Sequence, residues 1–302
     1  MTRIQGVNAA AVTPHGAAGR GADFGAALEL VDFVSKAGVA GIAVLGSTGE
    51  FLTLSFDERV RLMYLVVKRS RVPVLAGVGH ATLEGALELG RQACSAGAAG
   101  LLLMPPYFFR YGQDEIREFY TQYAAQAGTG VPVYIYNVPA FTSGISSETA
   151  VELLATGRFA GIKDSSGSYE YFAQLKELAA QHPFTLLVGD DALFTRARMA
   201  GADGVVSGTA AAIPELMVAL DRAIAAGAAD RIAALEARLQ EFLAWTGRFP
   251  TPVTVKTAIE ARGLKVGPPT LPLAPRTVLL LDEFRAWFGP WLAELNKEIA
   301  NV

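Results

Sequence analysis

The sequence predicts an α/β fold, a (β/α)8 TIM barrel followed by a C-terminal helical extension. Eight short apolar segments each precede a helical segment within the first 226 residues. Such alternation indicates a parallel sheet covered on both faces, and eight units match a barrel of roughly 250 residues. The alternative, an open doubly wound sheet, would usually carry a Gly-rich dinucleotide fingerprint. Gly77 and Gly79 are not followed by its third glycine, so the barrel is favoured.

The strands are expected where short apolar runs end at a turn. Residues 41–45, for example, are five apolar residues followed by a Gly/Ser/Thr loop, which is too short a run for a helix. The expected strands are residues 7–12, 41–45, 72–78, 101–104, 131–136, 159–162, 185–188 and 204–207.

The helices between them are expected from apolar residues spaced three to four apart. Leu28, Val31 and Val34 share one face of the first helix, Ser55 and Glu58 form a capping box, and a proline opens the eighth. The expected helices are residues 23–37, 55–67, 82–96, 113–127, 146–155, 168–181, 193–200 and 214–226.

The pattern changes after residue 226, where helices follow one another without strands. We expect helices at 230–245, at 252–262, and from 275 to the C-terminus. Residues 1–226 are therefore predicted to form the catalytic barrel, and 227–302 a helical extension packed on it. Its apolar residues suit packing on the barrel or on a neighbouring subunit; they include Leu279, Leu280, Phe284, Trp287 and Trp291.

Composition excludes several classes of function. The formal net charge is -3 with no basic run, which gives no electrostatic support for binding nucleic acid or anionic membranes. The single cysteine, Cys94, rules out an internal disulfide, and no His/Cys cluster has metal-ligand spacing. The N-terminus lacks the apolar core of a signal peptide, and no apolar run approaches the roughly 18 residues of a membrane span. A soluble, cytoplasmic protein without a metal is expected.

Barrel enzymes place their active sites at the carboxyl ends of the strands. The residues expected there are rich in hydroxyl groups, poor in metal ligands, and include one amine. They are Thr13, Ser47, Thr48, His80, Tyr107, Tyr136, Asn137, Lys163, Asp190, Asp191 and Ser207.

Lys163 follows the expected strand 159–162 and opens a Ser/Gly loop. Lysine is rarely buried without a partner or a task. Burial disfavours the charged amine, and a neutral amine can attack a ketone to form a Schiff base. The alternative is that Lys163 reaches the surface or pairs with Asp164.

Tyr136 ends the strand next to that of Lys163, so the two side chains are expected to converge. A phenol can donate and accept protons in turn. The Ser47-Thr48-Gly49 turn offers hydroxyl and N–H groups that can cradle a carboxylate. Together they indicate a Schiff-base enzyme acting on a 2-oxo acid. The alternatives are that Tyr136 is a core aromatic residue and that Ser47 and Thr48 only cap turns.

Asp190 and Asp191 follow the seventh strand, where many barrels bind phosphate. Adjacent carboxylates would repel a phosphate. A substrate without a phosphate group is therefore expected, unless one aspartate simply caps the helix that begins there.

Four motifs carry a resemblance to a known family: Gly46-Ser47-Thr48-Gly49-Glu50, Tyr136-Asn137-Val138-Pro139, Gly161-Ile162-Lys163-Asp164 and Gly189-Asp190-Asp191. In their order and spacing, and over essentially the whole chain, they resemble the dihydrodipicolinate synthase/N-acetylneuraminate lyase family of class I Schiff-base, pyruvate-dependent aldolases. The resemblance implies a pyruvate-type Schiff base on Lys163, proton transfer by Tyr136, and a relay and carboxylate site at Ser47 and Thr48. It also implies no cofactor and a homotetramer built as a dimer of dimers. Tyr107, Phe141 and Val206 are expected to contact the substrate.

Two positions depart from the synthases of this family. Phe141 replaces an arginine that holds the aldehyde's carboxylate, and the loop after it is one residue longer. The Pro-Tyr-Tyr motif, whose second tyrosine enters the neighbouring subunit's relay, reads Pro106-Tyr107-Phe108.

The leading interpretation is a lyase or aldolase that acts on pyruvate or a 2-keto-3-deoxy (sugar) acid through Lys163. The first alternative is dihydrodipicolinate synthase itself, which condenses pyruvate with aspartate semialdehyde; the missing arginine could then be replaced, for instance by Arg110. A dehydratase or deaminase that uses the same imine stays open. The alternative from a different class is a barrel that binds a 2-oxo acid without turnover.

Overall fold

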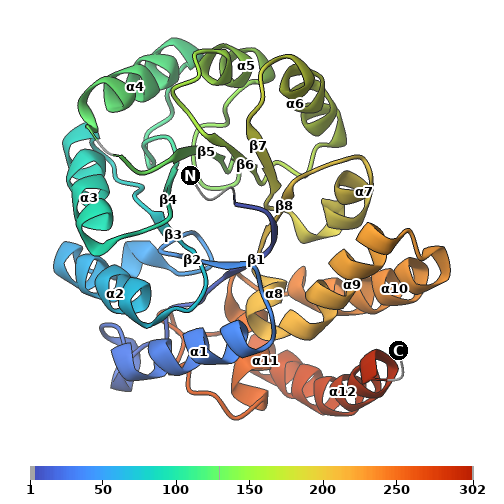
Figure 1. Ribbon diagram of the computed structural model, residues 1–302. Helices are drawn as coiled ribbons and strands as arrows, with labels where there is room; N and C mark the ends of the chain where they lie inside the picture. The colour runs from blue at the N-terminus through green and yellow to red at the C-terminus, as the bar shows by residue number, and fades with distance from the viewer. Residues whose placement is uncertain (1–3, 129, 301–302) are drawn as a thin grey trace.

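The computed structural model describes residues 4–128 and 130–300. Within them, eight parallel strands close into a barrel in the order of the sequence, so the predicted TIM-barrel class is confirmed (Figure 1). The strands are β1 (Gly6–Ala10), β2 (Gly41–Val44), β3 (Val74–Gly77), β4 (Gly100–Leu103), β5 (Val133–Asn137), β6 (Gly161–Asp164), β7 (Thr185–Val188) and β8 (Gly204–Ser207). The N-terminal residues 1–3 and the expected end of the last helix, residues 301–302, lie outside the described residues.

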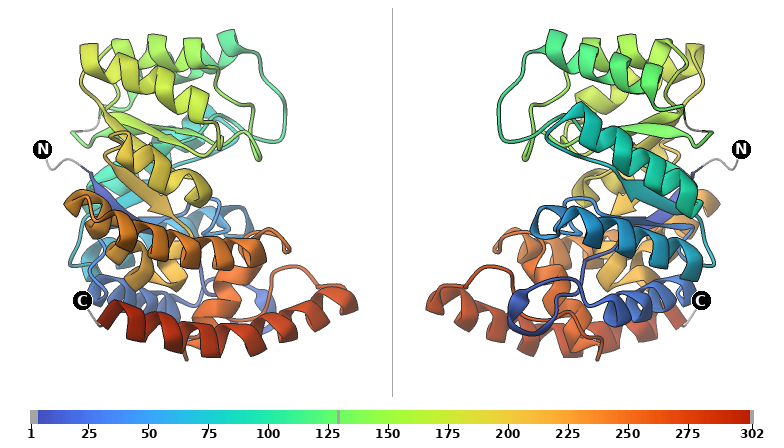
Figure 2. Two further views of the ribbon diagram at one scale, coloured as in Figure 1. Left: turned by 90° about the vertical axis from the view of Figure 1, so that its right-hand side faces the viewer. Right: turned by 90° about the vertical axis from the view of Figure 1, so that its left-hand side faces the viewer.

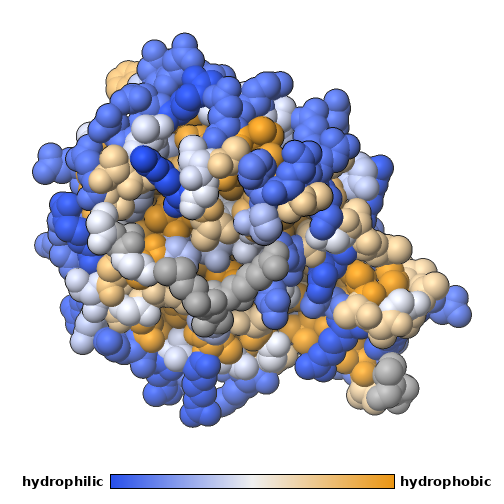
Figure 3. All heavy atoms as spheres, turned by 45° about the horizontal axis from the view of Figure 1, so that its top comes forward, coloured by the Kyte–Doolittle hydropathy of each residue, from blue (hydrophilic) through white to orange (hydrophobic). Residues whose placement is uncertain are grey.

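A ring of helices surrounds the barrel. The outer faces of these helices are mostly hydrophilic. Hydrophobic residues are visible between the helices, as expected for amphipathic helices (Figure 3). The helices of the barrel are α1 (Phe24–Lys36), α2 (Phe56–Arg69), α3 (Leu83–Ala96), α4 (Gln113–Gln126), α5 (Ser147–Ala155), α6 (Tyr169–Gln181), α7 (Phe194–Met199), α8 (Thr209–Ala212) and α9 (Pro214–Ala226). Three 3-10 turns accompany them: η1 (Ala17–Gly19), η2 (Phe51–Thr53) and η3 (Asp191–Leu193).

Several element ends differ from the expected ones by one or two residues, and two differences bear on the site. Lys163 lies within β6 and not after it, because β5 continues to Asn137 and pairs with Asp164, so the ladder runs past the lysine. The short helix α8 follows β8, where the sequence was expected to pass directly into the helix at residue 214. It is one turn of small residues, too short to show a helical period.

The C-terminal helices are α10 (Ala229–Thr246), α11 (Val253–Ala261) and α12 (Pro275–Ala300), and α12 lies along one side of the barrel (Figure 2). The Phe242 ring of α10 stacks on Trp291 of α12, with centroids 6.1 Å apart, and Phe284 also packs against Phe242. Phe284 and Trp291 are thus buried within the chain, whereas Leu279 is exposed.

The inside of the barrel is filled by side chains from alternate strand positions. Leu75, Leu102, Tyr134, Leu187 and Val206 belong to this interior cluster. A packed interior leaves the carboxyl ends of the strands as the place for a pocket. In residues 4–128 and 130–300, no helix is both long and apolar enough to cross a membrane.

Candidate active site

The register of β5 and β6 sets Tyr136 directly beside Lys163. Both side chains are buried, and the Lys163 Nζ atom lies 4.0 Å from the centroid of the Tyr136 ring. Neighbouring strands in register direct paired side chains to the same face. The structure therefore brings the predicted amine and phenol together inside the barrel mouth.

Asp164 does not serve as the partner of the lysine. Its carboxylate accepts hydrogen bonds from Asn137 Nδ2 at 2.8 Å and from Ser166 Oγ at 2.7 Å. Consecutive residues of a strand point to opposite faces, which separates Asp164 from Lys163. Burial raises the pKa of Asp164 although these hydrogen bonds oppose the rise. Asp164 thus organises the loop after β6.

Ser47 connects the turn after β2 to the phenol. Its Oγ atom lies 3.0 Å from the Tyr136 hydroxyl. The turn is held by a hydrogen bond of 2.6 Å from Thr13 Oγ1 to the Gly49 carbonyl. Leu45 and Glu50, on either side of the turn, have left-handed backbones with φ of 61° and 48°. Such conformations are costly for non-glycine residues, so the surrounding fold must hold this turn in place.

The pKa of Tyr136 is lowered from the ordinary tyrosine value. Burial is the largest influence and acts to raise it, but the Lys163 charge and hydrogen bonds with Ser47, Lys163 and Ser165 together outweigh burial. A phenol with a lowered pKa gives up its proton more readily near neutral pH. Tyr136 is therefore equipped to receive and return protons next to the amine.

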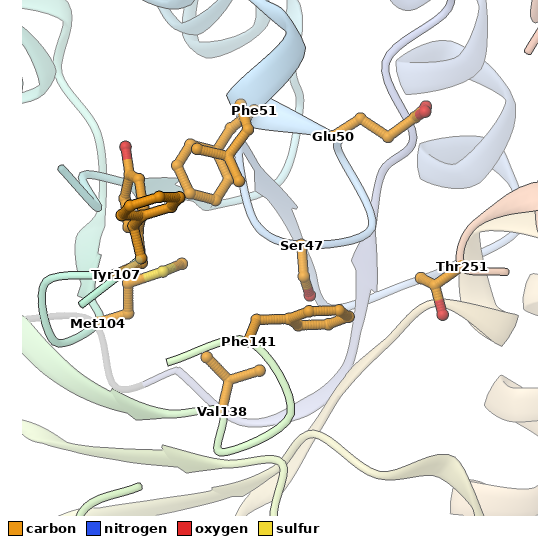
Figure 4. A pocket seen from close by; sticks show the side chains of 10 residues that line it. Ser47, Glu50, Phe51, Met104, Tyr107, Val138, Phe141 and Thr251 are labelled. Atoms are coloured by element: carbon orange, nitrogen blue, oxygen red, sulfur yellow. The ribbon is translucent and has the colours of Figure 1, made fainter. Parts of the chain in front are cut away.

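Lys163 lines a pocket of about 220 Å³ at the carboxyl ends of the strands, called the lysine pocket below. Six of the seven predicted site residues line it: Ser47, Thr48, Tyr136, Phe141, Lys163 and Val206. Tyr107 lines a neighbouring cavity of about 310 Å³, which shares Ser47, Val138, Phe141 and Thr251 with the lysine pocket (Figure 4). The two cavities therefore adjoin, with these shared residues between them.

Several residues of the lysine pocket were missed by sequence reasoning. Ser165 follows β6 and hydrogen-bonds the Tyr136 phenol. The helical extension supplies part of the wall through Leu243, Thr246, Thr251 and Val255. Nothing local in the sequence connects these last residues to the barrel mouth.

Position 189 requires glycine because side-chain atoms of Lys163 and Ser165 lie close to its backbone. A Cβ atom at this position would lie 2.8 Å from Lys163 Cε and 2.0 Å from Ser165 Oγ. The sequence motif Gly189-Asp190-Asp191 contains this glycine, and the structure supplies the reason for it, which is room for the lysine.

The two aspartates after β7 have separate tasks. Asp190 caps η3 by accepting a hydrogen bond of 2.9 Å from the Ala192 N–H, as in the alternative interpretation. Asp191 lines the lysine pocket and accepts a hydrogen bond of 3.0 Å from the Thr209 N–H. Burial raises the pKa of Asp191 against hydrogen bonds from Ser207 and Thr209. Its Oδ1 atom has no hydrogen-bond partner in the described part of the chain.

The other candidate residues at the strand ends form hydrogen bonds that hold the adjoining loops and helix starts. The Asn137 side chain donates a hydrogen bond to Asp164 and accepts one from the Ile145 N–H. Ser207 Oγ accepts a hydrogen bond from the Ala210 N–H. His80 Nδ1 bonds Thr82 beside the start of α3. Across residues 4–128 and 130–300, no group of three or more His, Cys, Asp or Glu side chains could hold a metal ion.

The chain matches known proteins along most of its length. The model of the "Dihydrodipicolinate synthetase family" matches residues 3–286. A 4-hydroxy-tetrahydrodipicolinate synthase of Methanothrix thermoacetophila is 35% identical over 246 residues, which are 81% of this chain and 83% of that protein.

Solved structures give the same match in three dimensions. The 4-hydroxy-tetrahydrodipicolinate synthase of Methylacidiphilum fumariolicum SolV superposes with a TM-score of 0.88 at 29% identity, covering 98% of this chain and 99% of that one. YagE, a prophage protein of the dihydrodipicolinic acid synthase family from E. coli K12, was solved in complex with pyruvate. It superposes with a TM-score of 0.85 at 28% identity, covering 94% and 99% of the two chains.

Proposed function

Because the chain belongs to the dihydrodipicolinate synthetase family of lyases, we propose that Lys163 forms a Schiff base with pyruvate or a 2-keto-3-deoxy acid. One observation carries the proposal: the buried Lys163 amine lies 4.0 Å from the ring of Tyr136, whose hydroxyl lies 3.0 Å from Ser47. The pyruvate bound to YagE supports a 2-oxo acid as the substrate.

In the first stage, the unprotonated Lys163 amine attacks the ketone carbon. The resulting carbinolamine loses its hydroxyl as water after taking a proton, and Tyr136 is placed to supply it. Ser47 and Thr48 hold the carboxylate of the 2-oxo acid at the turn after β2. Their hydroxyls line the same pocket as the lysine.

In the second stage, the iminium withdraws electrons from the adjacent carbon. Cleavage of the next carbon–carbon bond then leaves an enamine on Lys163 and releases an aldehyde. The proton lost by the substrate's hydroxyl group passes to the Tyr136–Ser47 pair, which lies beside the amine. The reverse sequence condenses pyruvate with an aldehyde.

The second candidate is the reaction named for the relatives, condensation of pyruvate with aspartate semialdehyde. The names of the curated relatives favour it. Phe141 disfavours it, because a phenylalanine gives the semialdehyde carboxylate no charged partner. A non-catalytic 2-oxo-acid-binding barrel would share the lysine chemistry, and steady-state turnover separates it from the enzyme.

Self-association and a cytoplasmic location are part of the same proposal. Phe108 is 88% exposed in this chain, and Phe109 and Leu52 are exposed as well. Exposed aromatic side chains of this kind suit a subunit contact. A homotetramer, built as a dimer of dimers, is the assembly we propose.

Reductive trapping tests the proposed function. Incubation with pyruvate and borohydride should add one pyruvate-derived mass per chain, mapped to Lys163, and Lys163→Ala should abolish it. Lys176 is exposed and bonds the Gly201 carbonyl away from the pocket, so Lys176→Ala is the matched control and should retain the label. Label on another lysine, or label that survives Lys163→Ala, would refute the mechanism.

A further inference from the structure

The cavity beside the lysine pocket is walled by apolar groups. Phe51, Met104, Tyr107, Val138 and Phe141 line this cavity of about 310 Å³, together with the exposed Leu52 and Phe108 of the proposed subunit contact. The rings of Phe51 and Tyr107 meet edge to face, with centroids 5.6 Å apart. An apolar cavity of about 150 Å³ can hold a benzene ring. This cavity therefore has room for an aromatic ring or a branched aliphatic group.

The cavity is placed to receive the far end of a substrate bound to Lys163. Ser47, Val138 and Phe141 border both this cavity and the lysine pocket. In Figure 4 the Phe141 ring lies beneath Ser47, between the hydroxyl and Val138. A 2-oxo acid held by its carboxylate at Ser47 and Thr48 can thus extend past Phe141 into the apolar space.

The cavity offers no cation to a negatively charged group. Among the described residues that line it, Glu50 alone carries a charge. The Glu50 carboxylate is paired with the buried Lys256 and accepts a hydrogen bond of 3.1 Å from Thr270 Oγ1. Figure 4 shows this carboxylate directed away from Phe141. Lys256 is therefore already committed to Glu50.

Arg110 does not replace the missing arginine in this structure. Its Nη1 atom donates a hydrogen bond of 2.6 Å to the Thr142 carbonyl, and Arg110 lines neither cavity. A carboxylate in the apolar cavity would lose its hydration without gaining a charged partner, which is costly.

We propose that the aldehyde released or captured by this enzyme carries an uncharged, apolar group, either aromatic or branched aliphatic, which occupies this cavity. The inference rests on the proposed Schiff-base function and adds the substrate class. An apolar cavity at this place disfavours aldehydes that carry a distal carboxylate.

The reaction balances without a further reactant. The iminium of Lys163 and pyruvate loses a methyl proton to the Tyr136–Ser47 pair and becomes an enamine. The enamine carbon then forms a bond to the aldehyde carbon, and the aldehyde oxygen takes that proton from the pair. Water then hydrolyses the imine and frees the lysine. The product is a 4-hydroxy-2-oxo acid whose fourth carbon bears the apolar group; cleavage follows the same steps in reverse.

The test compares specificity constants for four aldehydes with pyruvate: benzaldehyde, 3-methylbutanal, glyceraldehyde and succinic semialdehyde. The first two should exceed succinic semialdehyde by about 30-fold or more, as for a buried charge left without its partner. Preference for succinic semialdehyde or for glyceraldehyde would overturn the inference. Wild-type trapping with pyruvate is measured in parallel. If trapping fails, the proposed function fails; if trapping succeeds without the apolar preference, only this inference fails.

Two substitutions at one position provide the matched comparison. Phe141 is 56% exposed, so replacing it does not open a hole in the core. Phe141→Arg should raise the ratio of succinic semialdehyde to benzaldehyde turnover at least tenfold, because a guanidinium can pair with the carboxylate. Phe141→Leu keeps an apolar wall and should keep the wild-type order of substrates. An unchanged ratio in Phe141→Arg would show that Phe141 does not face the distal group.

Discussion

The Ser47 hydroxyl lies 3.0 Å from the Tyr136 hydroxyl although 89 residues separate them in the chain. Ser47 comes from the turn after β2 and Tyr136 from the end of β5, so the pair spans the barrel mouth. The amine of Lys163 lies beside the same phenol. In the proposed function this arrangement provides a proton path between substrate and phenol, which predicts different losses of kcat when each hydroxyl is removed.

Tyr136→Phe removes the proposed acid–base group and keeps the ring. We expect kcat for pyruvate-releasing cleavage to fall on the order of 10²-fold or more. The circular dichroism spectrum and melting temperature should stay near wild type, because the ring still fills its buried place. Wild-type turnover in this variant would mean that the phenol only packs.

Ser47→Ala removes one hydrogen bond to the phenol. Since a single hydrogen bond contributes about 1 kcal/mol, kcat should drop about fivefold, less than in Tyr136→Phe. Ser168 caps α6 by accepting from the Tyr171 N–H and lines neither cavity, so Ser168→Ala serves as the control. Equal kcat values for the two serine variants would contradict a role for Ser47 in the relay.

Gly189→Ala should displace the lysine, because its Cβ would lie 2.8 Å from Lys163 Cε. We expect the rate of borohydride trapping to fall at least about tenfold, in line with the cost of a misplaced reacting group. Gly247→Ala is the matched control, since the nearest atom to its Cβ is the Leu243 carbonyl oxygen at 3.9 Å. Trapping at the wild-type rate in Gly189→Ala would show that the lysine has more freedom than the structure indicates.

The free energy of unfolding should decline as the pH falls below about 6.5, which is the ordinary pKa of histidine. Burial is the main cause that lowers the pKa of His15, followed by the Lys256 charge, while Glu50 and Glu58 act to raise it. The folded protein therefore favours neutral His15. The contribution of neutral His15 to the free energy of unfolding is fully present above the pKa of the unfolded state. It is lost as the pH decreases toward the lowered pKa of the folded state, by at most about 1.4 kcal/mol per pH unit.

His15→Gln should accordingly reduce the loss of melting temperature between pH 7.5 and pH 5.5. His80 also has a pKa lowered by burial, so part of the pH dependence should remain. An identical pH dependence in His15→Gln and wild type would exclude this source of acid instability.

Light scattering should give a mass of about four times the 31.9 kDa chain. Phe108→Asn should lower this mass if the exposed ring forms the contact. Asparagine tolerates the left-handed backbone at this position, where φ is 80°, so the loop should keep its shape. A monomeric wild type at micromolar concentration would exclude the proposed assembly.

The sequence by itself determined the order of the elements and the chemistry available at the strand ends. Strand and helix periods and caps such as Ser55 with Glu58 are local, so they can be recognised without the fold. The rule that parallel strands present their carboxyl ends at one rim was enough to select Lys163, Tyr136, Ser47 and Thr48, all of which line the lysine pocket.

The tertiary structure alone decided which of those groups meet and what surrounds them. Closure of the barrel fixed the register that sets Tyr136 beside Lys163 and brought Ser165 and Gly189 against them. It also laid the helical extension over the site and committed Arg110 to a backbone carbonyl. These contacts join residues distant in the chain, and they depend on strand register and side-chain rotamers. Local sequence patterns carry no record of either, because both are set by packing of the whole barrel.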